Sequence, residues 1–283
     1  DEPMKKHTTF RIGGSADYFI MPSNEKELAE TIRVCRKFSI PIYIVGNGSN
    51  LLVGDKGFRG AIIQLYKSMG TFQVEGNQIT AQAGCSLAQI ANAALDAALT
   101  GFEFAAGIPG TLGGAVVMNA GAYGGEMKDV LTSVRVMTEE GEIMELPAEK
   151  LGLGYRTSII PEKRYIVLGA VISLTEGKKE EIKAQMDDFR QKRVSKQPLE
   201  YPSAGSTFKR PEGYFAGKLI QDSGLKGFTV GGAQVSEKHS GFVINKGNAT
   251  AADVMELIRQ VTAKVKEDTG VTMEPEVKQI GEF

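Results

Sequence analysis

Hydrophobic residues recur at helical spacing in four stretches of the chain. Helices are predicted over residues 24–40, 86–99, 178–194 and 250–268. The first two begin with residue pairs at the spacing of a capping box, Asn24 with Glu27 and Ser86 with Gln89. Gly270 follows the last helix, at a position where glycine commonly ends helices. The 178–194 stretch is charged on most of its faces.

Shorter apolar or alternating stretches lie between these helices and predict strands. They cover residues 10–20 with a break at the glycine pair 13–14, then 42–45, 51–53, 58–65, 71–75, 78–83, 133–138, 142–146, 165–174 and 271–280. Strands and helices do not alternate strictly, as a doubly wound parallel sheet requires. The pattern therefore predicts an α+β fold and not a Rossmann fold.

Composition narrows the class of protein. The 33 Lys and Arg residues nearly balance the 34 Asp and Glu residues, and no basic run is present, so neither nucleic acid nor an acidic membrane surface is an expected partner. No apolar stretch reaches the roughly 18 residues that span a bilayer. Cys35 and Cys85 are the only cysteines, too few for a disulfide framework or a four-thiolate metal site. We expect a cytoplasmic protein without a bound metal.

A first glycine-rich segment, Val45-Gly46-Asn47-Gly48-Ser49-Asn50-Leu51, interrupts two apolar strands. Glycines permit the left-handed backbone angles that point several N–H groups at one anion, so this turn could bind phosphate. It does not match the dinucleotide fingerprint, because Leu51 stands in place of the third glycine and no helix follows. A tight hairpin turn is the alternative reading.

A second segment, residues 107–125, contains seven glycines and almost no charge. Apolar residues such as Ile108, Leu112 and Val116 favour burial, so the segment is not a solvated linker. A flat cofactor pressed against bare backbone would account for it, with Thr111 and Asn119 available for polar contacts. Close helix packing through glycine is the alternative.

Three further stretches are weak signals when each is taken alone: 155–158, 204–209 and 274–277. Signatures of phosphate loops, zinc proteases, serine hydrolases and kinases are missing from the sequence. The chain has only two histidines, His7 and His239, so there are few candidates for a histidine general base.

Taken together, these stretches resemble a known family. Residues 6–14, 46–52, 107–123, 155–156, 205–208 and 274–277 are similar, in the same order, to the motifs of the UDP-N-acetylenolpyruvoylglucosamine reductase (MurB) family. The short interval between Arg156 and Lys196 resembles the form of the family that lacks an extra tyrosine-bearing loop over the substrate.

The resemblance implies an FAD-binding domain of the vanillyl-alcohol-oxidase type, made of two subdomains, followed by a C-terminal α+β substrate-binding domain. The expected boundaries are 1–65 for FAD-binding subdomain 1, completed by the strand 271–283, then 66–177 for FAD-binding subdomain 2 and 178–270 for the substrate-binding domain. The implied reaction reduces UDP-N-acetylglucosamine enolpyruvate to UDP-N-acetylmuramate for peptidoglycan synthesis. FAD is the implied cofactor, NADPH the co-substrate, and a monomer the expected state.

The resemblance also assigns site residues. The family's catalytic Arg, Ser and Glu correspond to Arg156, Ser206 and Glu276. Cofactor contacts are expected at Gly46, Asn47, Gly48, Ser49, Asn50, Leu51, Gly107, Pro109, Gly110, Thr111, Gly113, Gly114, Asn119, Gly121 and Tyr123. Substrate contacts are expected at Lys196, Lys209 and His239.

Two other functions fit parts of this pattern. A related FAD-dependent oxidase of a small alcohol would keep both glycine-rich segments but would need a base in place of Ser206. A non-catalytic flavin- or nucleotide-sugar-binding module would bind its ligand without turnover.

Overall fold

The computed structural model describes residues 1–283, which form two compact units. Unit 1 contains residues 1–19, 48–60 and 194–283, and unit 2 contains residues 20–47 and 61–193. Each unit therefore combines segments that are far apart in the sequence, and each is described by itself below.

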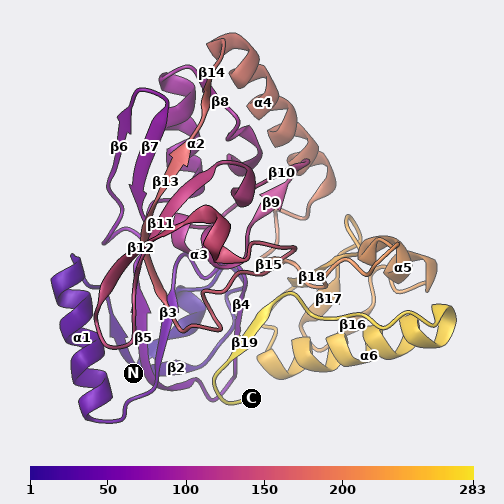
Figure 1. Cartoon of the computed structure of the whole chain (residues 1–283). Helices are drawn as coiled ribbons and strands as arrows, with labels where there is room; N and C mark the ends of the chain where they lie inside the picture. The colour runs from indigo at the N-terminus through magenta and orange to yellow at the C-terminus, as the bar shows by residue number, and fades with distance from the viewer. The chain divides into compact units, whose positions relative to one another are not determined.

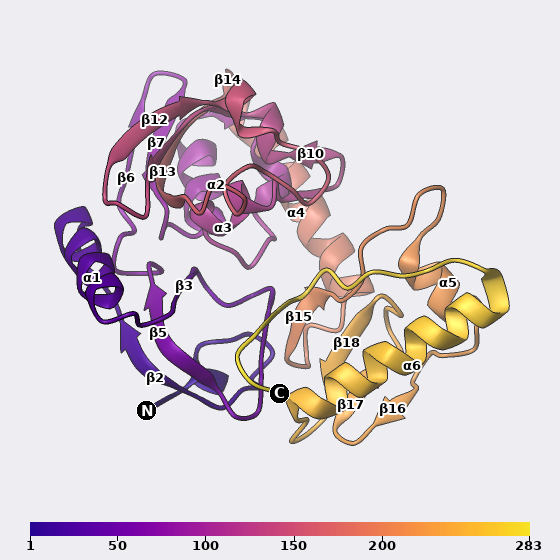
Figure 2. The ribbon, with the colours of Figure 1, turned by 60° about the horizontal axis from the view of Figure 1, so that its bottom comes forward.

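Unit 2 is built on a five-stranded antiparallel sheet with the strand order β12-β11-β13-β7-β6 (Figure 1). The strands are β6 (Phe72–Glu75), β7 (Gln78–Gln82), β11 (Leu131–Met137), β12 (Ile143–Pro147) and β13 (Ile166–Ser173). Buried residues such as Ile79 and Val134 alternate with more exposed ones such as Thr80 and Arg135, so one face of the sheet points to the core. Helices α2 (Leu87–Asp96) and α3 (Leu112–Val117) pack on that face (Figure 2).

The other elements of unit 2 border this sheet. They are α1 (Glu25–Lys37), β3 (Ile42–Val45), β5 (Phe58–Gln64), β8 (Leu99–Thr100), β9 (Gly121–Ala122), β10 (Gly125–Glu126), β14 (Thr175–Glu176) and α4 (Lys179–Lys196). Short 3₁₀ turns cover Glu103–Ala105, Met127–Asp129 and Ala148–Leu151. Strands β3 and β5 run parallel, with Ile42 opposite Ala61.

Unit 1 contains a four-stranded antiparallel sheet with the order β15-β18-β17-β16. Its elements are β1 (Glu2–Pro3), a 3₁₀ turn at Met4–Lys6, β2 (Ser15–Ile20), β4 (Leu51–Val53), β15 (Ser203–Ser206), α5 (Ala216–Asp222), β16 (Thr229–Val230), β17 (Ala233–Val235), β18 (Phe242–Asn245), α6 (Ala251–Thr269) and β19 (Lys278–Ile280). Helix α6 lies along the sheet, where Val254, Leu257 and Val261 pack into the core (Figure 2).

The helix signals read from the sequence are confirmed. Asn24 accepts a hydrogen bond from the backbone N–H of Glu27, and Ser86 and Gln89 form a complete capping box. Gly270 adopts φ +74° after α6. The expected α+β fold is also confirmed.

The alternative reading of the first glycine-rich segment, a tight hairpin turn, is wrong. Strand β3 pairs with β5, whereas β4 pairs in parallel with β19, with Leu51 opposite Lys278. The segment is therefore a connection between two strands that have different partners. The hydrophobic pattern could not show this, because it identifies strands but not their neighbours.

Other boundaries also differ from the prediction. The strand expected from residue 10 begins only at Ser15, because Arg11 and Gly13 adopt positive φ angles. The second helix ends at Asp96, since Ala98 has φ +56°, and Leu99 belongs to β8. The last strand is limited to β19, and helix α4 continues to Lys196.

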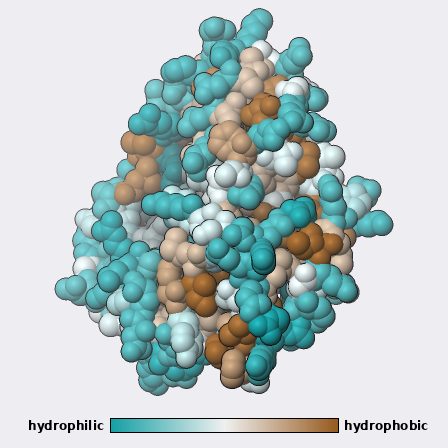
Figure 3. Space-filling view, turned by 90° about the vertical axis from the view of Figure 1, so that its left-hand side faces the viewer, coloured by the Kyte–Doolittle hydropathy of each residue, from teal (hydrophilic) through white to brown (hydrophobic).

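On the face drawn in Figure 3, hydrophobic residues appear in small groups among hydrophilic ones. None of the helices combines the length and apolar character that crossing a bilayer requires.

Candidate active site

The loop from Gly46 to Asn50 presents a run of unused hydrogen-bond donors. None of its five backbone N–H groups donates to another part of the protein. Gly48 has φ +62°, and a Cβ atom there would lie 2.1 Å from the carbonyl oxygen of His7. Only glycine fits this position, and the unused N–H groups suit an anion such as a pyrophosphate.

In the second glycine-rich segment, the glycines divide into two kinds. A Cβ atom on Gly113 would lie 2.9 Å from the Cβ of Ala83, and one on Gly125 would lie 2.6 Å from the ring of Phe104. These two glycines serve close packing within the protein. Gly114 is exposed in the first turn of α3, its nearest neighbour would be Thr111 Oγ1 at 3.7 Å, and its N–H group has no protein partner. Close packing therefore explains only part of the segment, and Gly114 is open to a ligand.

The two glycine-rich segments contact each other within unit 2. Asn47 donates a hydrogen bond from Nδ2 to the carbonyl oxygen of Pro109, at 2.8 Å. A Cβ atom on Gly46 would lie 2.1 Å from Thr111 Oγ1, so the backbone at Gly46 presses directly on that side chain. The structure thus brings together residues that the sequence showed only as separate motifs. The unused N–H groups of 46–50 and the exposed backbone at Gly114 fit a cofactor that carries both a pyrophosphate and a flat ring.

Two side chains of helix α4, neither of which was predicted from the sequence, hold the second segment. The Tyr123 ring stacks on Phe189 with centroids 4.4 Å apart and an 8° angle between the planes. Arg193, one turn further along α4, donates a hydrogen bond to the carbonyl oxygen of Gly107. Burial lowers the pKa of Arg193, although the guanidinium stays protonated. The i, i+4 spacing of Phe189 and Arg193 was the available signal, but the charges around α4 masked it.

Arg156 lies in a tight turn of unit 2. Gly154 and Thr157 exchange two backbone hydrogen bonds, of 3.2 and 3.3 Å, across the two residues between them. Arg156 has φ +54° and is half-buried, its Nη2 atom donates to the carbonyl oxygen of Gly121 at 3.5 Å, and its guanidinium lies over the Tyr155 ring. A guanidinium presents its N–H donors in a planar fork that matches the two oxygens of a carboxylate.

Ser206 and Glu276 lie on neighbouring segments of unit 1. The backbone N–H of Glu276 donates to the carbonyl oxygen of Thr207 at 2.7 Å, directly after Ser206. Ser206 is exposed at the end of β15 and Glu276 is half-buried. Asn50, from the first glycine-rich segment, donates from Nδ2 to the carbonyl oxygen of Glu276 at 3.3 Å. Two predicted catalytic residues and one predicted cofactor residue therefore meet within this unit.

The three expected substrate contacts have different surroundings. Lys196 is the exposed last residue of α4, and Lys209 forms a 3.0 Å ion pair with Glu274. His239 Nδ1 accepts a hydrogen bond from the backbone N–H of Gly241 at 3.1 Å, and burial lowers the pKa of its imidazole. Accepting this bond fixes the neutral ring with its proton on Nε2.

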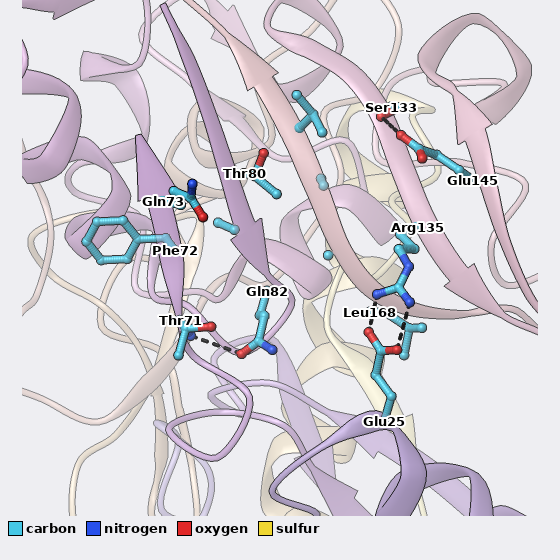
Figure 4. A pocket seen from close by; sticks show the side chains of 14 residues that line it. Glu25, Thr71, Phe72, Gln73, Thr80, Gln82, Ser133, Arg135, Glu145 and Leu168 are labelled. Atoms are coloured by element: carbon cyan, nitrogen blue, oxygen red, sulfur yellow. Dashed lines mark hydrogen bonds and ion pairs between the residues drawn. The ribbon is translucent and has the colours of Figure 1, made fainter. Parts of the chain in front are cut away.

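A separate hollow of about 420 Å³ lies on the open face of the sheet in unit 2 (Figure 4). An ion pair between Glu25 of α1 and Arg135 of β11 closes one side of it, and Thr80 and Gln82 of β7 line another part (Figure 4). None of the site residues predicted from the sequence lines this hollow.

Known proteins are similar to this chain over its whole length. Residues 16–147 match the family model "FAD binding domain", and residues 197–280 match "UDP-N-acetylenolpyruvoylglucosamine reductase, C-terminal domain". A UDP-N-acetylenolpyruvoylglucosamine reductase of Agathobacter rectalis is 57% identical over 100% of this chain and 94% of its own length. The protein of the same name from Caldanaerobacter subterraneus is also 57% identical, over 100% of this chain and 93% of its own length.

A solved structure gives the same result. The crystal structure of UDP-N-acetylenolpyruvylglucosamine reductase (MurB) from Thermus caldophilus superposes with a TM-score of 0.85 and 38% sequence identity, covering 98% of this chain and 97% of that one.

Proposed function

This chain belongs to the UDP-N-acetylenolpyruvoylglucosamine reductase family, and from this premise we propose that Arg156, Ser206 and Glu276 are its catalytic residues. The protein is an FAD-dependent oxidoreductase that uses NADPH to reduce UDP-N-acetylglucosamine enolpyruvate to UDP-N-acetylmuramate in peptidoglycan precursor synthesis. Bound FAD would be held by the two glycine-rich segments and would supply the hydride chemistry that links NADPH to the methylene carbon of the enolpyruvyl group. The protein's own residues must then stabilise the charge that develops on the substrate and supply one proton.

Arg156 is proposed to hold the substrate carboxylate. Hydride addition to the methylene carbon pushes negative charge onto the adjacent carbon and its carboxylate, which becomes enolate-like. A guanidinium is always protonated and can give two parallel hydrogen bonds to a carboxylate. The position of Arg156 in a tight turn, half-buried and with a permanent charge, supports this electrostatic role.

Ser206 is proposed to protonate the carbon next to the carboxylate. Its O–H bond breaks as the new C–H bond forms, and solvent returns the proton to the hydroxyl. A serine hydroxyl is a weak acid, so it must be held close to the basic carbon to act. The exposed position of Ser206, beside the backbone bond between Thr207 and Glu276, is the observation that carries this proposal.

Glu276 is proposed to polarise the reacting group. An unscreened carboxylate would repel a neighbouring enolate. We therefore assign it a role as a carboxylic acid or through a bridging water molecule, next to Ser206.

The two glycine-rich segments are proposed to bind FAD. The unused N–H groups of 46–50 suit its pyrophosphate, and the exposed backbone of Gly114 suits its ring system. The direct contact of Asn47 with Pro109 supports one shared cofactor for both segments. Lys196, Lys209 and His239 are proposed to contact the nucleotide sugar.

We propose the domain division 1–65 with 271–283, 66–177 and 178–270. The parallel pairing of β19 with β4 supports the addition of the C-terminal strand to the first of these. We further propose a monomer, which light scattering on a sizing column would test. A cytoplasmic location is supported by the free thiols of Cys35 and Cys85, which suit a reducing compartment.

An anaerobic titration tests the reaction itself. The purified protein should show a flavin absorbance that NADPH bleaches. One equivalent of UDP-N-acetylglucosamine enolpyruvate should restore the absorbance and yield one equivalent of UDP-N-acetylmuramate. An alcohol oxidase would recover its absorbance with oxygen but not with this substrate, and a binding module would not be bleached.

A further inference from the structure

Asn119 uses its side chain entirely inside the protein. The residue is 1% exposed, and its two amide hydrogens go to Glu126 Oε2 at 2.7 Å and to the carbonyl oxygen of Gly154 at 3.0 Å. Its Oδ1 atom accepts from the backbone N–H of Lys128 at 2.9 Å. No amide hydrogen remains for a cofactor.

The bond to Gly154 connects Asn119 with the turn of residues 154–157, which carries Arg156. Gly154 is the residue at which that turn closes, and its carbonyl oxygen accepts both from Thr157 and from Asn119. The backbone bonds across the turn are long, so the 3.0 Å bond from Asn119 is the shortest one made by this carbonyl. The side-chain bond therefore helps to fix the position of the turn relative to α3, together with the 2.6 Å bond from Ser158 Oγ to the carbonyl oxygen of Val117.

The same residue also controls the other end of Arg156. The guanidinium donates to the carbonyl oxygen of Gly121, two residues after Asn119 in the chain. Asn119 has φ +44°, a left-handed conformation that asparagine tolerates better than most residues. The Asn119 amide thus bonds directly to the turn that carries Arg156, and it also bonds to Glu126, the residue that pairs with Gly121.

We propose that Asn119 is a positioning residue for Arg156, acting through the hydrogen bond from its Nδ2 to the carbonyl oxygen of Gly154. This inference rests on the proposed role of Arg156. It assigns to the Asn119 side chain a function in the substrate half-reaction, and none in binding FAD.

The test removes this one bond with little change of shape. Asn119→Asp preserves the size of the side chain and tolerates the left-handed backbone, but an ionised carboxylate cannot donate to Gly154. Asn119→Asp is combined with Glu126→Gln. The side-chain amide introduced at position 126 can then donate to the carboxylate introduced at position 119, which replaces the hydrogen bond that Asn119 donates to Glu126. All rates are compared with those of Glu126→Gln alone.

Anaerobic stopped-flow absorbance follows each half-reaction separately. We expect flavin reduction by NADPH and FAD occupancy to stay at the level of the Glu126→Gln protein. Reoxidation by the enolpyruvyl substrate should fall by roughly tenfold, and by up to about a hundredfold if the guanidinium moves by about an ångström. Thr100→Val removes a partly buried hydrogen bond to Glu103 in the same unit and serves as the stability control, with a lower melting temperature but an unchanged reoxidation rate.

A double-mutant cycle separates positioning from general damage. In an Arg156→Ala background, the Asn119 change should cause no further loss of reoxidation, because it acts through the missing residue. Losses that multiply in that background, equal slowing of both half-reactions, or loss of FAD would each overturn the proposal. If Arg156→Ala alone leaves reoxidation unchanged, the catalytic assignment of Arg156 fails first, and that of Asn119 with it.

Discussion

Asn47 and Pro109 are joined by a 2.8 Å hydrogen bond from the asparagine Nδ2 atom to the proline carbonyl oxygen. This bond connects two glycine-rich segments that lie far apart in the sequence. It holds the two segments against each other, and Gly114 is exposed on the second one. The consequences for cofactor binding can be tested at individual glycines.

Gly114→Val should release FAD while leaving the protein folded. A Cβ atom at this exposed position meets nothing closer than 3.7 Å, so we expect the fold to tolerate the change. A branched side chain here would occupy the volume of the cofactor ring. The absorbance ratio of flavin to protein measures occupancy. Gly113→Val is the matched control, because its Cβ meets Ala83 at 2.9 Å and should lower the melting temperature of the apoprotein. Equal FAD content in wild type and Gly114→Val would count against this surface.

Arg156→Lys should lose most of the activity although the charge remains. An ammonium group cannot give the two parallel hydrogen bonds that a carboxylate takes from a guanidinium. The loss should appear in reoxidation by the substrate and not in reduction by NADPH. Steady-state turnover near that of wild type would remove Arg156 from the mechanism.

Cys85 should resist alkylation in the native protein. Its side chain is fully buried, and desolvation raises the pKa of its thiol to about 11. At about pH 8 only roughly one molecule in a thousand carries the reactive thiolate. Mass spectrometry after iodoacetamide treatment should find Cys85 unmodified in buffer and modified in denaturant. Rapid labelling of the native protein would contradict the packing described for it.

His239 should make the fold less stable in acid. Burial lowers the pKa of its imidazole below the ordinary value of 6.5, so the unfolded chain binds the proton more readily. Its contribution is complete above pH 6.5 and is lost as the pH falls through the lower folded value. The urea midpoint of unfolding is measured at about pH 7.5 and at about pH 5.5. The decrease between these two pH values should be smaller in His239→Gln than in wild type. An identical decrease in both proteins would exclude this contribution.

Local signals in the sequence predicted much of the fold. The capping pairs at Ser86 and Asn24 and the glycine at position 270 involve neighbouring residues only, so the sequence shows them directly. The pairing of β4 with β19 could not be predicted, because apolar runs carry no information about which distant strand lies beside them. This is why a hairpin turn stayed open as an alternative for the first glycine-rich segment.

The site was predictable as a set of motifs but not as a set of contacts. The order of the motifs led to the prediction of Ser206 and Glu276, whereas their adjacency depends on a backbone bond at Thr207. Phe189 and Arg193 were missed because an exposed charged helix hides two residues that face inward. The hydrogen bond of the Asn119 side chain to Gly154 could likewise not be predicted, because it joins residues that are distant in the sequence.

The most direct test of the mechanism is the effect of Ser206→Ala on the two half-reactions, measured by anaerobic stopped-flow absorbance of the flavin. Hydride transfer from NADPH takes no proton from this hydroxyl, so bleaching should proceed at nearly the wild-type rate. Reoxidation by UDP-N-acetylglucosamine enolpyruvate should slow by roughly a hundred- to ten-thousandfold, the range for losing a positioned proton donor. Ser206→Cys should recover part of this rate by offering another donor. Equal slowing of both halves, or of neither, would contradict Ser206 as the source of the proton.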